Sequence, residues 1–293
     1  MPARVADPAA AVDALAGTGA PAGVRGTCGL VWVEGTDAPR FLQGLLSNDV
    51  AALATGAAHR TLLLDSKGHI VCDLRLHRDG EDAFTLVATP AAAEVLAQTL
   101  ARYHFSEDLE LLGPEPSDLL TVPGDLRTED AVALPGLVPG TTDLVVADAG
   151  AALDVLGLPE APAEALEVLR VERGIPATGR DTGPRTLVQE VGLETVAVSF
   201  SKGCYLGQET VARAQHRGQV HRVVRGLRAA APIPEGAEVS SDGKVVGTVG
   251  SAVASPRFGD IALAVLRREV PPGTDVVVEG LGGPATVCEV PFR

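Results

Sequence analysis

A chain of 293 residues is long enough to form two or three modules, and its net charge of −14 at pH 7 disfavours binding to bulk nucleic acid or to anionic membranes. No apolar stretch reaches the roughly 18 residues of a membrane-spanning helix. The N-terminus lacks the basic and apolar regions of a signal peptide. We therefore expect a cytoplasmic protein with neither nucleic acid nor membrane as a partner.

The four cysteines, Cys28, Cys72, Cys204 and Cys288, are widely spaced and form no C-x-x-C pair. This spacing argues against a zinc ribbon, against a cluster held by closely spaced ligands and against a secreted disulfide framework. We expect a reducing compartment and no stably bound metal.

Helix and strand signals alternate in the first hundred residues. Asp and Thr before proline are typical helix starts, and turn residues separate the apolar runs. The expected elements are, in chain order, a helix from Asp7-Pro8 to Gly17, a strand over 29–35, a helix capped by Asp37, strands over 61–64, 70–76 and 84–88 with a turn at 65–68, and a helix from Thr89-Pro90 to about Arg102.

Residues 113–162 are rich in proline, glycine and acids, with short strands expected over 119–122 and 144–146. A helix is expected over 163–173, because Gly174 suits its C-terminal cap and Pro176 prevents continuation. Beyond about residue 213 the pattern becomes all-β, with a hairpin signal at 241–243 and strands over 261–266, 276–279 and 286–290. The prediction is an α+β body over 1–212 followed by a small C-terminal β-barrel domain over 213–293.

The segment over 201–213 carries the most informative chemistry. Gly203 and Gly207 bracket Cys204-Tyr205 and allow a sharp turn or a close approach to a ligand. Lys202 and Arg213 supply positive charge, and a nearby cation lowers a cysteine pKa. Cys204 is therefore a candidate reactive thiol, with Lys202 beside it; the alternative is a buried structural cysteine, the usual state of a free thiol.

Residues 202–209, Lys-Gly-Cys-Tyr-Leu-Gly-Gln-Glu, resemble the K-G-C-Y-x-G-Q-E signature of YgfZ-type proteins, which belong to the superfamily of the glycine cleavage T-protein (GcvT). Further stretches are similar to that family over 41–50, 68–74, 170–176 and 188–190, where Val188 replaces a proline. The resemblance implies a GcvT-like fold of three subdomains around a folate-binding channel, with two intertwined subdomains in the body. It also implies a folate-dependent role in making or repairing iron–sulfur proteins, through client proteins that the sequence does not identify.

The same resemblance suggests which residues bind tetrahydrofolate or a derivative. T-proteins have a folate-contacting glutamate at the position of Glu172, and a carboxylate can accept two hydrogen bonds from a pterin; the alternative is a solvated acid at a helix end. Arg170 belongs to the same stretch, and we include Tyr205, Gln208 and Arg213 among the candidate folate contacts.

Asp73 is a candidate for a catalytic role, together with Cys204 and Lys202. T-proteins carry two adjacent acids here, whereas this chain has Cys72-Asp73 and keeps only one. The leading hypothesis is therefore a folate-binding accessory protein. A tetrahydrofolate-dependent aminomethyltransferase or demethylase is the alternative, and a module that senses folate without chemistry is a third possibility.

Residues 210–234 contain no Asp or Glu but hold five arginines, namely Arg213, Arg217, Arg222, Arg225 and Arg228. Such a cluster could steer the glutamate tail of a folate. It could equally be the solvated face of a strand. Nucleic-acid binding is a weaker explanation, because the chain is acidic and poor in aromatic residues for stacking.

Overall fold

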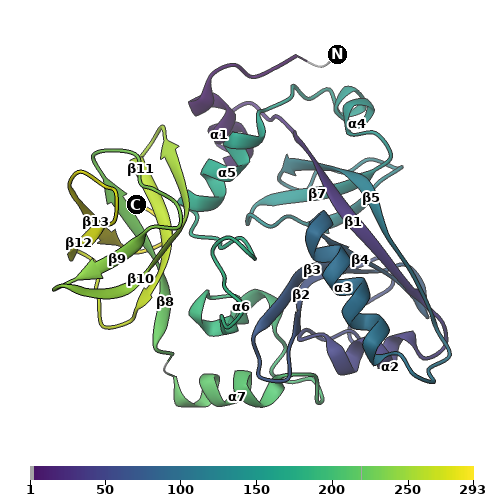
Figure 1. The fold of residues 1–293 in the computed structure, drawn as a ribbon. Helices are drawn as coiled ribbons and strands as arrows, with labels where there is room; N and C mark the ends of the chain where they lie inside the picture. The colour runs from purple at the N-terminus through teal and green to yellow at the C-terminus, as the bar shows by residue number, and fades with distance from the viewer. Residues whose placement is uncertain (1–2, 219) are drawn as a thin grey trace.

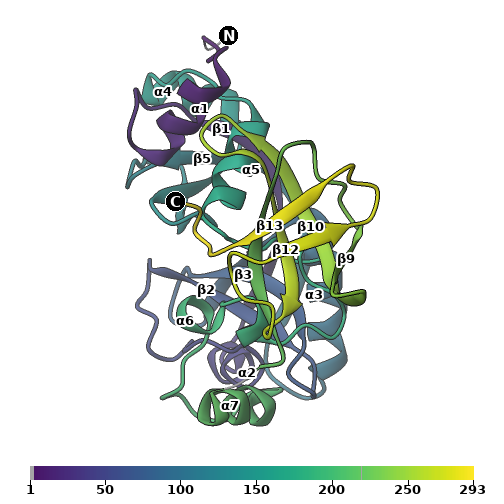
Figure 2. The same cartoon turned by 90° about the vertical axis from the view of Figure 1, so that its left-hand side faces the viewer.

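The computed structural model describes residues 3–218 and 220–293 and contains two β units joined by helices (Figure 1). A seven-stranded antiparallel sheet forms the first, and a closed six-stranded barrel forms the second. Figure 2 shows the same units from the barrel side. The α+β class and the C-terminal barrel predicted from the sequence are confirmed.

The sheet has the strand order β2-β3-β4-β1-β5-β7-β6. Its long central strands β1 and β5 pair antiparallel along most of their length, with Val24 opposite Thr121 and Glu34 opposite Glu110. The strands are β1 Val24–Glu34, β2 Ala58–Leu64, β3 Ile70–Arg78, β4 Ala83–Ala88, β5 Glu110–Pro123, β6 Val132–Pro135 and β7 Thr141–Val146.

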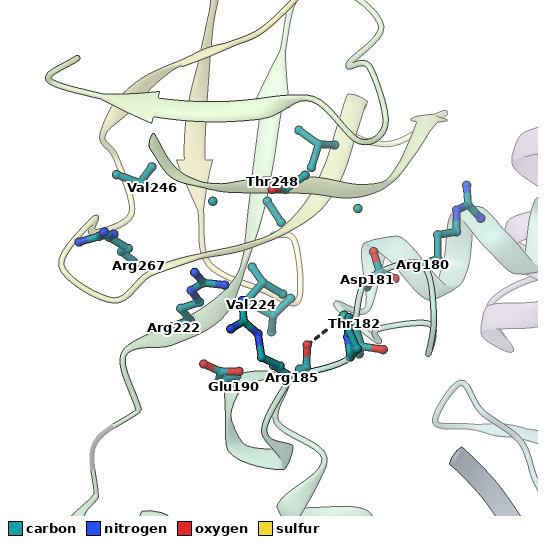
Figure 3. A pocket seen from close by; sticks show the side chains of 18 of the residues that line it. Arg180, Asp181, Thr182, Arg185, Glu190, Arg222, Val224, Val246, Thr248 and Arg267 are labelled. Atoms are coloured by element: carbon teal, nitrogen blue, oxygen red, sulfur yellow. Dashed lines mark hydrogen bonds between the residues drawn. The ribbon is translucent and has the colours of Figure 1, made fainter. Parts of the chain in front are cut away.

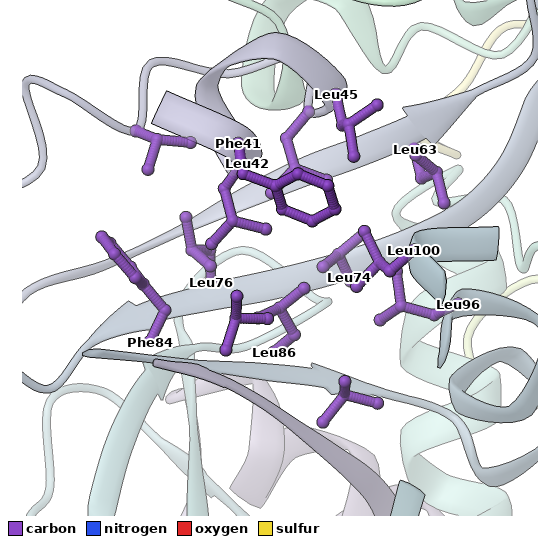
Figure 4. Close-up of a cluster of buried hydrophobic side chains, with 14 of the residues drawn as sticks. Phe41, Leu42, Leu45, Leu63, Leu74, Leu76, Phe84, Leu86, Leu96 and Leu100 are labelled. Carbon is purple, nitrogen blue, oxygen red and sulfur yellow. The ribbon is translucent and has the colours of Figure 1, made fainter. Parts of the chain in front are cut away.

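Helices cover the two faces of this sheet unequally. The first face packs against α2, α3 and α4, and the leucine-rich core shown in Figure 4 lies beneath α2 and α3. The second face is covered at one end by α1 and α5. The helices are α1 Pro8–Ala16, α2 Ala38–Leu45, α3 Pro90–Tyr103, α4 Ala149–Leu156, α5 Ala163–Glu172, α6 Glu194–Ala197 and α7 Gln208–Arg217, with a 3-10 turn η1 at Val188–Glu190.

The barrel closes in the order β10-β11-β8-β13-β12-β9, so it leaves no open sheet edge. Asp242 and Gly243 both have positive φ, as the two-residue turn of the predicted hairpin between β9 and β10 requires. The barrel strands are β8 Arg222–Ala229, β9 Glu238–Ser241, β10 Lys244–Ser255, β11 Gly259–Arg267, β12 Asp275–Val278 and β13 Pro284–Cys288.

Most expected elements are present, with three differences. Asp37 precedes α2 but makes no side-chain cap, because its carboxylate accepts hydrogen bonds from Arg40 and from the backbone of Asp108. The strand expected over 119–122 is the end of the much longer β5, which starts at Glu110 and continues into the Pro- and Gly-rich region. The expected boundary between residues 212 and 213 falls inside α7, so the division into domains stays a proposal.

Candidate functional site

The loop that carries Cys204 lies between α6 and α7 and is fastened to the C-terminal end of α2. The Leu206 N–H donates to the Gly44 carbonyl at 3.0 Å, and the Ser199 N–H donates to the Ser47 carbonyl at 3.0 Å. Cys204 itself is exposed, whereas Cys28 and Cys72 are buried. The loop therefore holds a solvent-accessible thiol on a fixed backbone.

Lys202 provides the strongest attachment of this loop. Its Nζ donates to the carbonyls of Gln43, Leu46 and Asn48 at 2.8, 2.6 and 2.9 Å, and lies 5.1 Å from the centre of the Tyr205 ring. Burial lowers the pKa of Lys202 to about 8. All three ammonium protons are used by carbonyls at the end of α2, so the structure gives Lys202 a positioning role beside Cys204.

The rest of the signature builds the floor under the loop. Tyr205 is buried in a cluster with Val188 and Val211, and burial raises its pKa to about 12. Gly207 has φ +81°, and a Cβ there would lie 2.5 Å from the Asp65 carbonyl oxygen in the β2–β3 turn. The second glycine is thus required by close backbone contact.

The two remaining candidates of this segment lie on α7. Gln208 begins the helix and is half-buried, while Arg213 is exposed. Gln189 of η1 donates to the Val211 carbonyl at 2.8 Å and ties the helix to the body. These contacts group Lys202, Cys204, Tyr205, Gln208 and Arg213 around one loop and the helix that follows it.

Asp73 lies on the second face of the sheet and is paired. Its carboxylate accepts from Arg60 Nε at 2.8 Å and Nη2 at 2.5 Å. Cys72 points to the opposite face, into the core under α2 and α3, and its burial raises its pKa. Cys72 and Asp73 therefore lie on opposite faces of the sheet, and Cys72 does not take the place of a second acid beside Asp73.

A second buried ion pair follows on the same face. Asp143 of β7 lies 3.2 Å from Arg75 Nη2 of β3, and its other oxygen accepts from the Thr121 hydroxyl at 2.6 Å. Sequence reasoning missed both residues of this ion pair. The available signals were a charge next to an apolar stretch in each strand, namely Asp143 before Leu144-Val145-Val146 and Arg75 between Leu74 and Leu76.

Arg170 lies at the junction of α5 with the barrel and is buried. Its guanidinium donates to Asp181 at 2.9 Å, to the Ser251 hydroxyl at 2.5 Å and to Glu167 at 2.8 Å. These acidic partners outweigh desolvation and raise the pKa of Arg170. Asp181 also accepts from the Ser251 N–H at 2.6 Å, so the network fastens β10 to α5.

Glu172 occupies the same junction, one half-turn further along. Its side chain is 3% exposed, and its carboxylate accepts from the Ser255 hydroxyl at 2.6 Å and from the Arg257 guanidinium. It is therefore not the solvated acid of the alternative explanation. In this structure both of its oxygens have protein partners from the barrel.

A cavity of about 300 Å³ opens between the second face of the sheet and α5. Its walls are mainly apolar, and buried polar side chains converge on it. The residues that matter for its chemistry are Gly26, Thr121, Val138, Asp143, Leu166 and Arg170. An apolar pocket with a few fixed polar groups is the usual form of a small-molecule site.

Within residues 3–218 and 220–293, no three His, Cys, Asp or Glu side chains come together as a metal site. Over the same ranges, no helix has both the length and the apolar character needed to cross a membrane.

The chain matches the GCVT N-terminal domain family over residues 26–117 and the glycine cleavage T-protein C-terminal barrel domain family over residues 221–293. It is 30% identical to the tRNA-modifying protein YgfZ of Edwardsiella ictaluri, over 82% of each chain. It is 29% identical to the mitochondrial iron-sulfur cluster assembly factor IBA57 of Mus musculus, over 87% of this chain and 81% of that protein.

Among solved structures, the aminomethyltransferase T of the glycine cleavage system from Bartonella henselae superposes with a TM-score of 0.80 at 22% identity, covering 100% of this chain and 91% of that one. This likeness establishes the GcvT-like fold. Together with the two matched domains and the relative that is 30% identical over 82% of each chain, it shows that the chain belongs to the YgfZ family of the GcvT superfamily.

Proposed function

We propose that this chain is a cytoplasmic folate-binding accessory protein that supports the assembly or repair of iron–sulfur clusters. The family supports this function, because one relative is named an iron-sulfur cluster assembly factor and others are named tRNA-modifying proteins. The ligand is tetrahydrofolate or a derivative. The client proteins are bound at a different place from the folate, near the exposed thiol.

The observation that carries folate binding is the cavity beneath α5. A pterin is flat, with two apolar faces and an edge of hydrogen-bonding nitrogens, and the cavity offers apolar walls with the Asp143 carboxylate at its side. Thr121 and Arg75 fix that carboxylate at 2.6 and 3.2 Å, so it presents an oriented acceptor. Arg170 holds the wall that α5 contributes.

Glu172 does not line this cavity, and two distinct roles in folate binding are open to it. It contacts the pterin directly if the ligand replaces Arg257 as its partner, or it holds the barrel against α5 through Arg257 and Ser255. An experiment can distinguish the two roles, because only direct contact predicts that Glu172→Gln lowers the affinity for tetrahydrofolate more than Arg257→Gln does.

Cys204 is proposed as the functional thiol of the accessory role. Its exposure suits contact with a client protein, and Lys202 and Gly207 fix the backbone around it. Tyr205, Gln208 and Arg213, named above as candidate folate contacts, belong to this loop and α7 and do not line the cavity beneath α5.

One-carbon transfer to tetrahydrofolate is the second candidate function. The fold of an aminomethyltransferase and the presence of Asp73 favour it. The bidentate pair with Arg60 weakens it, because that carboxylate is engaged and its neighbour Cys72 faces the other side of the sheet. Catalytic formation of a one-carbon folate from an aminomethyl donor, lost in Asp73→Asn, would favour this candidate.

Calorimetric titration with tetrahydrofolate tests the binding site. Gly26→Leu places a side chain into the cavity without a backbone clash, because only the Leu119 carbonyl oxygen lies within 4 Å of the added Cβ, at 3.9 Å. We expect it to abolish binding while the thermal midpoint stays near that of the wild type. Unchanged affinity in Gly26→Leu would remove folate from this cavity.

A further inference from the structure

A separate cavity, of about 700 Å³, lies between the barrel and the segment over 180–190 (Figure 3). Strands β8, β10 and β11 form one wall, and the loop that follows α5 forms the other. Its volume lies within the roughly 300–1,000 Å³ range of small-molecule sites. Neither the family signature nor the smaller cavity beneath α5 accounts for it.

The chemistry of this cavity is cationic. Arg185 comes from the loop, and Arg222 and Arg267 come from the barrel wall (Figure 3). The last two are direct cross-strand partners on β8 and β11. Like charges in that position repel each other, so an anion between them would stabilise the pair.

The charges of these arginines are poorly balanced by the protein. Among the described residues, no carboxylate forms an ion pair with Arg185 or Arg222, and Arg267 has only the exposed Glu269 at 3.6 Å. The other charged groups of the cavity already have partners. Arg180 is held by Glu167 and Glu235, Asp181 by Arg170, and the Glu190 carboxylate accepts from the Leu187 N–H at 2.9 Å.

The sequence cluster over 210–234 divides accordingly. Arg225 pairs with Glu289 at 3.0 Å, Arg228 lies over the Phe258 ring, and Arg213 is exposed on α7. The side chain of Arg217 lies outside the described residues. Of the four arginines of the cluster whose side chains are described, only Arg222 lines the cavity, where it joins Arg185 and Arg267.

We propose that this cavity binds the carboxylates of a γ-linked oligoglutamate chain, the tail of a polyglutamylated folate. The inference rests on the proposed folate function and adds a preference among folates. Asp181 lines this cavity and Arg170 lines the smaller one, and these two residues are 2.9 Å apart. The two cavities are therefore neighbours across one buried ion pair, and the tail of a folate whose ring lies in the smaller one must pass around this pair to reach the larger.

The test compares folate mono- and pentaglutamate by calorimetry on the full chain, with an oligo-γ-glutamate peptide that lacks the pterin as a separate probe. We expect the pentaglutamate to bind about tenfold more tightly, because several partly exposed ion pairs of modest strength act together. Added salt is expected to weaken the peptide and the pentaglutamate more than the monoglutamate.

The variant for this test carries Arg185→Ser, Arg222→Ser and Arg267→Ser, with each single replacement as a second variant in case the triple one is unstable. Arg127→Ser is the matched control, because Arg127 is 63% exposed and pairs only with Asp125 outside the cavity. We expect the cavity variants to lose the preference for pentaglutamate and the peptide binding, while monoglutamate binding and the control stay unchanged.

Equal affinity of the wild type for mono- and pentaglutamate would overturn the proposal, as would a preference that survives all three replacements. Binding of a short RNA in place of the peptide, lost in the same variants, would assign the cavity to nucleic acid and also overturn it. A wild type that binds the peptide but not folate monoglutamate would instead contradict the folate function, while the anion site in this cavity would still be supported.

Discussion

Replacement of Lys202 by methionine tests whether this residue positions the Cys204 loop. Lys202 is 8% exposed, and its ammonium donates to three carbonyls at the end of α2 at 2.6–2.9 Å. Methionine keeps much of the length and the apolar stem of lysine but donates nothing. The three carbonyl oxygens then lose their partner inside the protein.

The expected cost follows from these contacts. Hydrogen bonds from a charged donor contribute about 1.5–3 kcal/mol each, but the buried ammonium is itself poorly solvated and water can replace part of the loss. We therefore expect a net destabilisation of about 2–4 kcal/mol at pH 7. Lys244→Met is the control, because Lys244 is exposed on the barrel and surface changes usually stay within about 0.5 kcal/mol.

The pH dependence has a definite sign. Burial lowers the pKa of Lys202 from 10.5 to about 8, so between these values the unfolded chain binds more protons than the folded one. The stability of the wild type relative to Lys202→Met is therefore lower below pH 8 and rises as the pH increases toward 10.5. Other titrating groups, such as the buried cysteines, are common to both proteins and cancel in the difference.

Urea unfolding of both variants at several pH values measures the effect, and amide hydrogen exchange localises it. The N–H groups of Ser199 and Leu206 are expected to exchange faster in Lys202→Met, since their acceptors lie on the segment that Lys202 holds. A midpoint shift no larger than that of Lys244→Met, with unchanged exchange at these two amides, would refute the positioning role.

Three further predictions follow from named contacts. Gly207→Ala is expected to destabilise the protein by about 1–3 kcal/mol, because Gly207 has a positive φ and an added Cβ would meet the Asp65 carbonyl oxygen. Gly203→Ala is expected to be near neutral, because nothing lies within 4 Å of the added Cβ, and equal unfolding midpoints of the two variants would contradict this difference. In a double-mutant cycle, Glu172→Ala and Arg257→Ala are expected to couple by about 1–3 kcal/mol, and additive changes in unfolding free energy would show that the pair does not hold the barrel. A thiol reagent is expected to label Cys204 in the native protein, and Cys28 and Cys72 only after unfolding. Cys28 and Cys72 are buried, and burial raises the pKa of Cys28 to about 11 and also raises the pKa of Cys72, so mass spectrometry that finds Cys72 modified first would contradict its place in the core.

Local chemistry made much of the fold predictable. Asp7-Pro8 starts α1, and its carboxylate accepts from the Ala9 N–H as the sequence suggests. Gly174 follows α5 with positive φ, and Asp242-Gly243 forms the barrel hairpin. Asp37 shows the limit, because a tertiary contact with Asp108 competes for the carboxylate that would cap the helix.

The candidate site was predictable in composition but not in arrangement. The sequence indicates that Lys202 is a cation next to Cys204. In the fold, however, the Lys202 ammonium contacts the end of α2, more than 150 residues earlier in sequence. Arg75 and Asp143 come from strands whose closeness depends on the fold of the whole second face, and neither belongs to a recognisable motif. The roles of Lys202, Arg75 and Asp143 thus depend on contacts with residues that are distant in sequence, which local patterns do not indicate.

We propose that Cys204 takes part in a folate-dependent accessory role. The most direct measurement is the activity of several iron–sulfur enzymes in a bacterial strain that lacks its own YgfZ, complemented with this chain, with Cys204→Ala or with Gly26→Leu, each at equal protein level. We predict that the wild type restores the activities and that both variants fail, although Cys204→Ala still binds folate. Full restoration by both variants would contradict the account.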